Sequence, residues 1–375
     1  MTAQYSPFEP PRRVLMGPGP SNVSPRVLLA MARPTVGHLD PSFLGLMDEL
    51  AAQLRQLFGT ANRMTIPISG TGSAGMETAF DNLLEPGDTA IIGVNGVFGQ
   101  RMVANAERAG ARAVTVEAPW GEPLDVGQLI EAHGSSPDAR LLAVVHAETS
   151  TGVLQPLEEL GAYLRDTETL FVVDMVTSLG GVPVEVDQRG IDVAYSGTQK
   201  CLSVPPGLAP ITLSERALAR IRARKHEVHS WYLDLTLIGS YWGGERAYHH
   251  TAPINALYGL HEGLRIILEE GLPERFERHR RFGAALQSGL LKRGLELLVD
   301  ERYRLPQLTS VRVPGGVDDV AFRRQLLERF GIEIGGGLGP LAGAIWRVGL
   351  MGETCREEYV TLFLSALDEL MGDRA

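Results

Sequence analysis

Short runs of apolar residues, rather than alternating ones, recur between about residues 60 and 210 of this chain. Such runs are typical of strands in a parallel sheet that is covered on both faces. Segments with apolar side chains at helical spacing separate most of the runs, which predicts a doubly wound, mostly parallel α/β domain. The predicted strands are 64–69, 89–95, 112–118, 141–148, 169–176 and 191–197.

The order of elements changes beyond about residue 275, and this indicates a second, smaller α+β domain. A helix is followed by a strand at 307–314, a helix at 317–330, strands at 331–337 and 344–350, and a last helix. We therefore expect three parts along the chain. They are an N-terminal segment (1–20), a large α/β domain (21–265) and a small C-terminal α+β domain (266–375).

The composition narrows the classes of partner and compartment. A net charge of −10 over 375 residues argues against nucleic acid and anionic membranes as partners. The two cysteines, Cys201 and Cys355, cannot build a disulfide framework, which favours a reducing, cytoplasmic location. We see no apolar run of membrane-spanning length, and the first residues lack the apolar core of a signal peptide.

A glycine-rich loop lies between the first predicted strand and a helix. Gly70, Gly72 and Gly75 match the spacing of the dinucleotide-binding fingerprint. That fingerprint also needs an acidic residue at the end of the next strand, where this chain has Asn95. The loop is better interpreted as an anion site, where free N–H groups and the helix dipole favour a phosphate. A nicotinamide dinucleotide remains the alternative ligand.

Two charged residues follow apolar strands of the same predicted sheet. Asp174 ends one strand and Lys200 follows the end of another, and ligands bind beyond the carboxyl ends of such strands. Separately, Asp174 could cap a helix and Lys200 could be a solvated loop residue. Together with the loop at 70–75 they supply an amine for an aldehyde, a carboxylate for a pyridine nitrogen and a phosphate site. Pyridoxal phosphate requires these three groups.

Eight stretches, in order along nearly the whole chain, resemble the class V aminotransferases, and more narrowly the alanine–glyoxylate or serine–pyruvate branch. The resemblance implies a fold-type I enzyme with a seven-stranded sheet, pyridoxal 5′-phosphate as cofactor, and a homodimer with shared active sites. It implies transfer of an amino group from alanine or serine to glyoxylate or pyruvate by a ping-pong mechanism. The stretches are 17–22, 69–88, 148–156, 172–181, 195–208, 248–253, 336–340 and 346–352.

The same resemblance implies a role for individual residues. Lys200 would form the Schiff base with the cofactor, and Asp174 would pair with the pyridine nitrogen. Arg347 would bind the substrate carboxylate, and the backbone near Gly19 would line the substrate pocket. The other implied cofactor contacts are Thr71, Gly72, Ser73, Phe98, Thr149, Gln199 and, from the neighbouring subunit, Tyr248 and Thr251.

Two positions depart from the family pattern. Phe98 stands where the eukaryotic branch often has Trp, so a ring remains but the indole N–H is lost. Ser73 stands where relatives can carry His. His38 is a further candidate for a place near the pocket, and we expect no metal site. Because Arg347 is the one arginine assigned to the substrate, small neutral amino acids are favoured over dicarboxylates.

Other reactions remain open at this point. Ureidoglycine–glyoxylate transamination, aminoethylphosphonate–pyruvate transamination and a pyridoxal phosphate lyase reaction would all use the same cofactor. A cysteine desulfurase needs a reactive cysteine on a mobile loop, and neither Cys201 nor Cys355 lies in such a segment. Replacing Lys200 would abolish the pyridoxal phosphate reactions and would spare a dehydrogenase built on the loop at 70–75.

Overall fold

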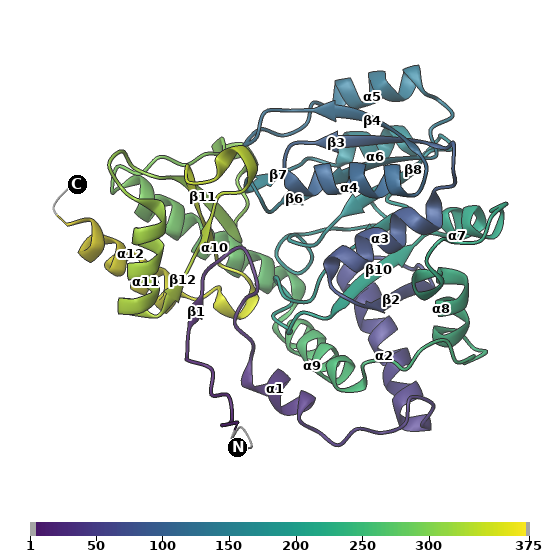
Figure 1. Cartoon of the computed structure of the whole chain (residues 1–375), viewed down its shortest axis with the longest axis horizontal. Helices are drawn as coiled ribbons and strands as arrows, with labels where there is room; N and C mark the ends of the chain where they lie inside the picture. Colours follow the sequence, from purple (N-terminus) through teal and green to yellow (C-terminus); the bar gives the residue numbers. More distant parts are fainter. Residues whose placement is uncertain (1–4, 373–375) are drawn as a thin grey trace.

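A computed structural model of the chain describes residues 5–372, which form a larger part around a seven-stranded sheet and a smaller part around a three-stranded sheet (Figure 1). The sheet order of the larger part is β2-β10-β9-β8-β5-β3-β4. All neighbours are parallel except β10, which is antiparallel to both β2 and β9. The strands are β2 (Met64–Ser69), β3 (Thr89–Val94), β4 (Arg112–Glu117), β5 (Leu141–Val145), β8 (Leu170–Asp174), β9 (Val193–Tyr195) and β10 (Leu208–Leu213).

The expected α/β fold and its six predicted strands are confirmed, but β10 is missing from the prediction. Pro210 lies in the middle of this strand and is a residue that normally argues against a strand. It faces Pro67 of β2, so two residues that have no N–H group share a position where the strands exchange no hydrogen bonds. The predicted strand 141–148 also divides, because β6 (Ala147–Glu148) leaves the sheet and pairs with β7 (Val153–Leu154).

Helices cover both faces of the large sheet, which explains the continuous apolar runs. In β5, Leu142 and Val144 pack into one core, whereas Leu141, Ala143 and Val145 pack into the other. The first core includes α2 (Pro41–Phe58), α5 (Val126–Ser135), α6 (Glu158–Leu164) and α9 (Ile254–Glu270). The second includes α3 (Gly72–Leu83), α4 (Val97–Arg108), α7 (Glu215–Arg222) and α8 (Leu235–Trp242).

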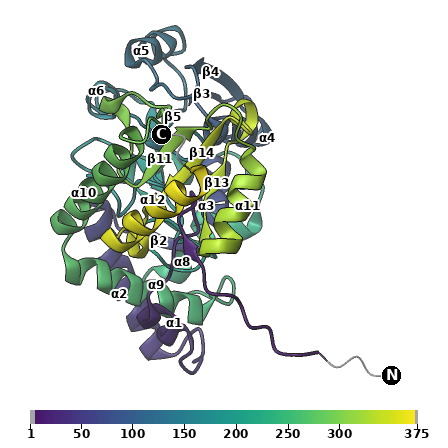
Figure 2. The ribbon, with the colours of Figure 1, turned by 90° about the vertical axis from the view of Figure 1, so that its left-hand side faces the viewer.

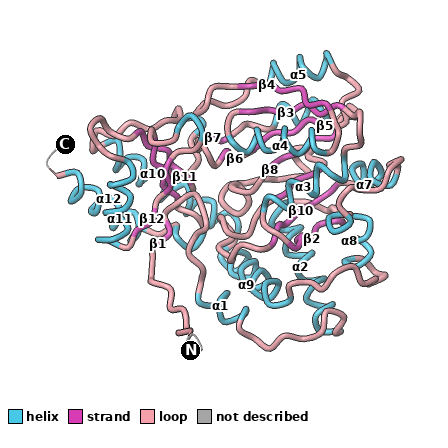
Figure 3. Tube along the Cα trace, in the orientation of Figure 1, coloured by secondary structure: helices cyan, strands magenta, loops and turns pink. Residues whose placement is uncertain are grey.

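The smaller part has its own apolar core and an antiparallel sheet in the order β11-β14-β13. In Figure 3 its helices and strands lie to the left of the larger part. Its strands are β11 (Leu308–Arg312), β13 (Gly335–Gly336) and β14 (Ile345–Gly349), and its helices are α10 (Leu272–Leu291), α11 (Asp319–Phe330) and α12 (Glu357–Met371).

The N-terminal segment connects the two parts. Residues 5–13 project from the body (Figure 2), and β1 (Val14–Leu15), which follows them, pairs with β12 (Ile332–Glu333) of the smaller part. The chain then crosses to the larger part, where the Ser21 amide donates to the carbonyl of Gln199 at 2.9 Å. Helix α1 (Pro25–Met31) follows and packs against α9. Within residues 5–372, none of the helices is both long and apolar enough to cross a membrane.

Candidate active site

The carboxyl ends of β2, β8 and β9 bring the predicted charged residues to one edge of the sheet. Asp174 is the last residue of β8 and pairs in register with Tyr195 of β9, while Lys200 follows in the loop between β9 and β10. Lys200 and Asp174 are both buried, and the charge of each shifts the pKa of the other. The two side chains therefore lie in one buried region at the strand ends.

The two carboxylate oxygens of Asp174 differ in how well they are satisfied. Oδ1 accepts a hydrogen bond from the Val176 amide at 2.9 Å, whereas Oδ2 is buried with no partner in hydrogen-bonding geometry within residues 5–372, although the Tyr195 hydroxyl lies close enough to the carboxyl to lower its pKa. Burial raises the pKa of Asp174 to about 7, and the nearby charge of Glu148 adds to this. A carboxyl at this depth is ionised most readily when a cation faces it, so the arrangement suits a protonated ring nitrogen.

Lys200 is held under the N-terminal segment. Its Nζ donates to the carbonyl of Pro18, and its own carbonyl accepts from Ser21 Oγ at 2.7 Å. Gly19 has a φ of +102°, and a Cβ there would lie 2.5 Å from Cδ of Lys200, so only glycine fits this approach. Burial, with the positive charge of Arg347, lowers the pKa of Lys200 to about 8. A neutral, nucleophilic amine is thus accessible near neutral pH.

The glycine-rich loop forms the N-terminus of α3 beside these residues. Thr71 is the N-cap residue but its side chain makes no capping hydrogen bond, and the helix then begins at Gly72. A Cβ at Gly72 would lie 3.2 Å from Cγ2 of Val176, so the loop packs closely on the segment after Asp174. Gln199 adds a buried Oε1 for which the described part of the chain supplies no partner. Ser73 is exposed at this end of the helix.

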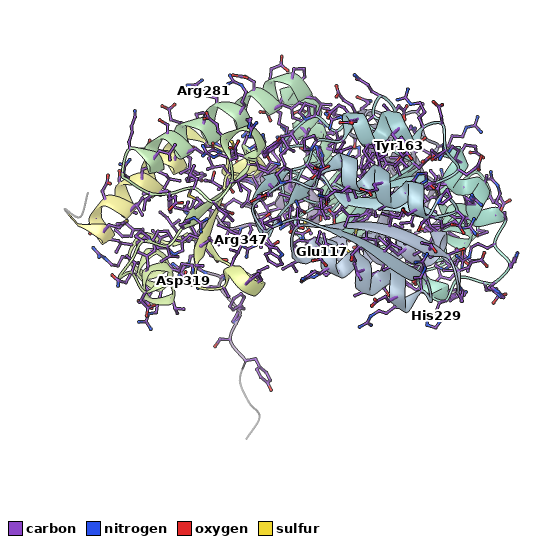
Figure 4. The ribbon with its side chains drawn as sticks, turned by 90° about the horizontal axis from the view of Figure 1, so that it is seen from above. Glu117, Tyr163, His229, Arg281, Asp319 and Arg347 are labelled. Carbon is purple, nitrogen blue, oxygen red and sulfur yellow. The ribbon has the colours of Figure 1, made fainter. Side chains whose placement is uncertain are left out.

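Arg347 comes from the smaller part and reaches the larger one (Figure 4). It lies in β14 between Ser310 of β11 and Gly335 of β13. Nε donates to the Gly336 carbonyl at 2.7 Å, and Nη1 donates to the Thr149 carbonyl at 2.9 Å. Burial lowers the pKa of Arg347 to about 10, so the side chain still carries its charge at neutral pH. The smaller part therefore delivers a cation to the edge where Lys200 lies.

The remaining predicted contacts divide into two groups. Thr149 and Phe98 lie at this site: Thr149 Oγ1 bonds to Thr177 Oγ1, and Phe98 is half-buried in the first turn of α4. Tyr248 is 58% exposed and bonds to Thr251 at 3.2 Å. The ring of His38 lies 4.9 Å from that of Tyr248.

Three polar residues of this region are absent from the predicted site: Glu148, Tyr195 and Thr177. All three are buried, and the Tyr195 hydroxyl lies close enough to the Asp174 carboxyl for each to shift the pKa of the other. Glu148 ends an apolar run just as Asp174 does, and this signal could have identified it. By contrast, Cys201 and Cys355 are buried, and burial raises the pKa of each thiol to about 12, which leaves neither as a ready nucleophile.

The side chains at this edge fit pyridoxal phosphate. Asp174 Oδ2 is an open acceptor, Lys200 is an amine whose pKa burial has lowered, and α3 begins without a side-chain cap in the described structure. These correspond to the ring nitrogen, the aldehyde and the phosphate of the cofactor.

Comparison with known proteins gives consistent relatives. Residues 17–356 match the family described as aminotransferase class-V. The chain is 44% identical to (S)-ureidoglycine–glyoxylate transaminase of Bacillus subtilis, covering 96% of this chain and 91% of that protein. It is 41% identical to alanine–glyoxylate aminotransferase of Callithrix jacchus, with 98% and 90% covered. The crystal structure of an alanine–glyoxylate aminotransferase from Nostoc sp. superposes with a TM-score of 0.97 at 50% identity, covering 99% of this chain and 98% of that one.

Proposed function

The chain belongs to the class V aminotransferase family and is an aminotransferase with pyridoxal phosphate as its cofactor, and we propose that it moves an amino group from alanine or serine to glyoxylate or pyruvate. The observation that carries the proposal is the burial of Lys200 beside Asp174, where one group is an amine with a lowered pKa and the other has an open oxygen. When bound, the cofactor takes the amino group from the donor, holds the resulting electron pair in its ring, and passes the amino group to the acceptor.

Lys200 has two tasks in this proposal. Its neutral Nζ attaches the cofactor, and once the amino donor has displaced it, Nζ moves the proton that leaves the substrate α carbon. The lowered pKa suits both tasks because a general base works best when its pKa lies near the working pH. Asp174 keeps the ring nitrogen protonated, and its burial makes this ion pair stronger than it would be in water.

Arg347 orients the substrate. Its Nε and Nη1 are held by main-chain carbonyls, so the planar group is fixed in one orientation, and Nη2 makes no hydrogen bond among residues 5–372. A carboxylate matches that geometry, and a lysine could not reproduce it. The hydrogen bond from Nη1 to the Thr149 carbonyl also links Arg347, the proposed partner of the substrate carboxylate, to the segment that would border the cofactor.

Assembly as a cytoplasmic homodimer with shared active sites is part of the proposal. Tyr248 and Thr251 are exposed and bonded to each other, which supports a role as phosphate contacts in a neighbouring copy rather than in their own. Phe98, Gln199, Thr71, Gly72 and Ser73 would complete the cofactor site, and Gly19 would border the substrate.

A matrix of amino donors against glyoxylate, pyruvate and 2-oxoglutarate tests the proposal. We expect a yellow holoenzyme that borohydride fixes at Lys200, and high kcat/KM for alanine or serine with glyoxylate or pyruvate. Each donor alone should leave pyridoxamine phosphate on the protein. A holoenzyme that releases product without forming pyridoxamine phosphate would show a lyase, and colourless protein that cannot be reconstituted would contradict the whole proposal.

Ureidoglycine is the second candidate donor. The 44% identity to the Bacillus subtilis transaminase, against 41% for the Callithrix jacchus enzyme, favours including it in the matrix. A kcat/KM for ureidoglycine that exceeds those for alanine and serine by tenfold or more would replace the first candidate while leaving the cofactor site unchanged.

A further inference from the structure

Glu148 is a fully buried carboxyl beside the site, and the proposed chemistry gives it no part. Its Oε1 accepts two hydrogen bonds from Ser150, one from the amide at 3.0 Å and one from Oγ. Its Oε2 is buried and meets no strict hydrogen-bonding geometry within residues 5–372, although the backbone amides of Phe98 and Gly99 lie close enough to lower the pKa of the carboxyl. A carboxyl buried in this way is costly, so its position requires an explanation.

The open side of Glu148 faces the first turn of α4. A Cβ on Gly96 would lie 2.4 Å from Cδ of Glu148 and 2.5 Å from Oγ of Ser150, so the carboxyl and the hydroxyl press against this backbone. Gly96 is the N-cap residue of α4 and has no side chain to offer the helix. Ser150 Oγ instead accepts from the Val97 amide at 3.0 Å.

The electrostatics agree with this placement. Burial raises the pKa of Glu148, and hydrogen bonds from Ser150 and the backbone amides of Phe98 and Gly99 oppose that rise. Negative charge at a helix N-terminus is favourable because the first amides have no partner within the helix. Glu148 and Ser150 thus supply, from a distant segment, the cap that the sequence of α4 lacks.

We infer that Glu148 is a positioning residue that caps α4 from across the chain and thereby holds the Phe98 ring in place over the cofactor. Phe98 is the second residue of the helix, so its backbone follows any movement of the first turn. The segment 148–150 also carries the Thr149 carbonyl that binds Arg347. The same short segment therefore fixes both Phe98, the proposed ring-stacking residue, and Arg347, the proposed partner of the substrate carboxylate. The inference depends on the proposed cofactor contact of Phe98.

Hydrogen exchange on the cofactor-free protein tests the cap directly. In Glu148→Gln an amide N–H would face the helix amides, so we expect exchange at Val97, Phe98 and Gly99 to become about tenfold faster, as for a lost helix cap. Asp192→Asn is the matched control, because Asp192 is also a buried carboxyl that accepts from a backbone amide, that of Phe171 at 3.0 Å. Unchanged exchange in Glu148→Gln, or equal acceleration in the control, would overturn the inference.

A double-mutant cycle on cofactor affinity tests whether Glu148 acts through Phe98. We expect Glu148→Gln to weaken pyridoxal phosphate binding about tenfold in the wild-type background and to add little in the Phe98→Ala background. Fully additive losses would show that Glu148 acts elsewhere. A protein that binds no pyridoxal phosphate at all would contradict the proposed function instead, and the exchange result at α4 would still report on the cap.

Discussion

Two groups of buried polar side chains lie within this chain, and they differ in how fully they are satisfied. At the junction of the two parts, Arg275 donates to the carbonyls of Gly180 and Cys201 and to Glu270. Arg278 likewise uses all of its guanidinium nitrogens, binding Glu270 and two main-chain carbonyls of the smaller part. At the strand ends the opposite holds, because Asp174 and Gln199 each keep a buried atom with no partner in hydrogen-bonding geometry among residues 5–372.

The difference separates a structural network from a site prepared for ligands. A buried polar group that is fully hydrogen-bonded stabilises one arrangement, whereas an open one lowers stability until something binds it. The cluster of Arg275, Arg278 and Glu270 therefore holds the two parts together. The buried polar atoms near Lys200 that lack a partner are available to bind cofactor and substrate. Substitutions in the two groups should have opposite consequences for stability and activity.

The largest effect is expected for Lys200→Ala. Transamination should fall by at least about a thousandfold, because the amine that attaches the cofactor and moves the proton is gone. The cofactor-free protein should unfold at the same temperature as the wild type or higher, since a buried amine has been removed. Steady-state kinetics and thermal unfolding measure the two effects, with the exposed Lys292→Ala as control. Retained activity in Lys200→Ala would show that this buried amine does not belong to a ligand site, and the contrast between the two groups of polar side chains would no longer hold.

Arg275→Met should have the next largest effect, and on stability. It removes one of the two partners of Glu270 and leaves the buried carbonyls of Gly180 and Cys201 without their donor, which together should cost about 3–5 kcal/mol. Urea unfolding measures the loss. Arg280→Met is the matched control, because its pair with Glu277 is exposed and such pairs contribute at most about 1 kcal/mol. Equal losses in the two variants would show that the buried network has no special structural role.

Arg347→Lys should reduce kcat/KM by about 10- to 100-fold, which is the loss expected when charged hydrogen bonds to a carboxylate are removed. The positive charge remains, so the result isolates the geometry of the guanidinium. Arg312→Lys in the neighbouring strand β11 should leave the kinetics unchanged, since its pair with Glu296 is exposed. If both variants behave like the wild type with every amino donor, Arg347 does not bind the substrate carboxylate.

Asp174→Asn should change the stability of the cofactor-free protein in the direction opposite to Arg275→Met. The pKa of this carboxyl is raised from 3.8 to about 7, so in the wild type its charging destabilises the cofactor-free fold as pH rises from about 4 to about 7. The variant should therefore be more stable by up to about 4 kcal/mol above pH 7 and similar below pH 4. Its affinity for pyridoxal phosphate should fall. A stability difference that does not change with pH would contradict this assignment of the charge.

The sequence by itself determined the alternation of strands and helices, the two charged strand ends and the glycine-rich loop. Periodicity and strand ends are local properties, and the carboxyl ends of parallel strands must meet at one edge of a sheet. Asp174, Lys200 and Gly72 could therefore be brought together without coordinates. Strand β10 escaped because Pro210 argues against a strand, and only pairing with Pro67 shows why it is tolerated.

Only the tertiary structure decided which polar atoms are satisfied. Gly19 and Pro18 cover a lysine about 180 positions away in the chain, and Arg347 reaches Thr149 from the other part of the molecule. Glu148 and Asp174 look alike in the sequence, since both end apolar runs, yet one faces the amides of α4 and the other keeps an open oxygen near Lys200. Hydrogen bonds act over about 3 Å, so their partners depend on how distant segments pack rather than on the pattern along the chain.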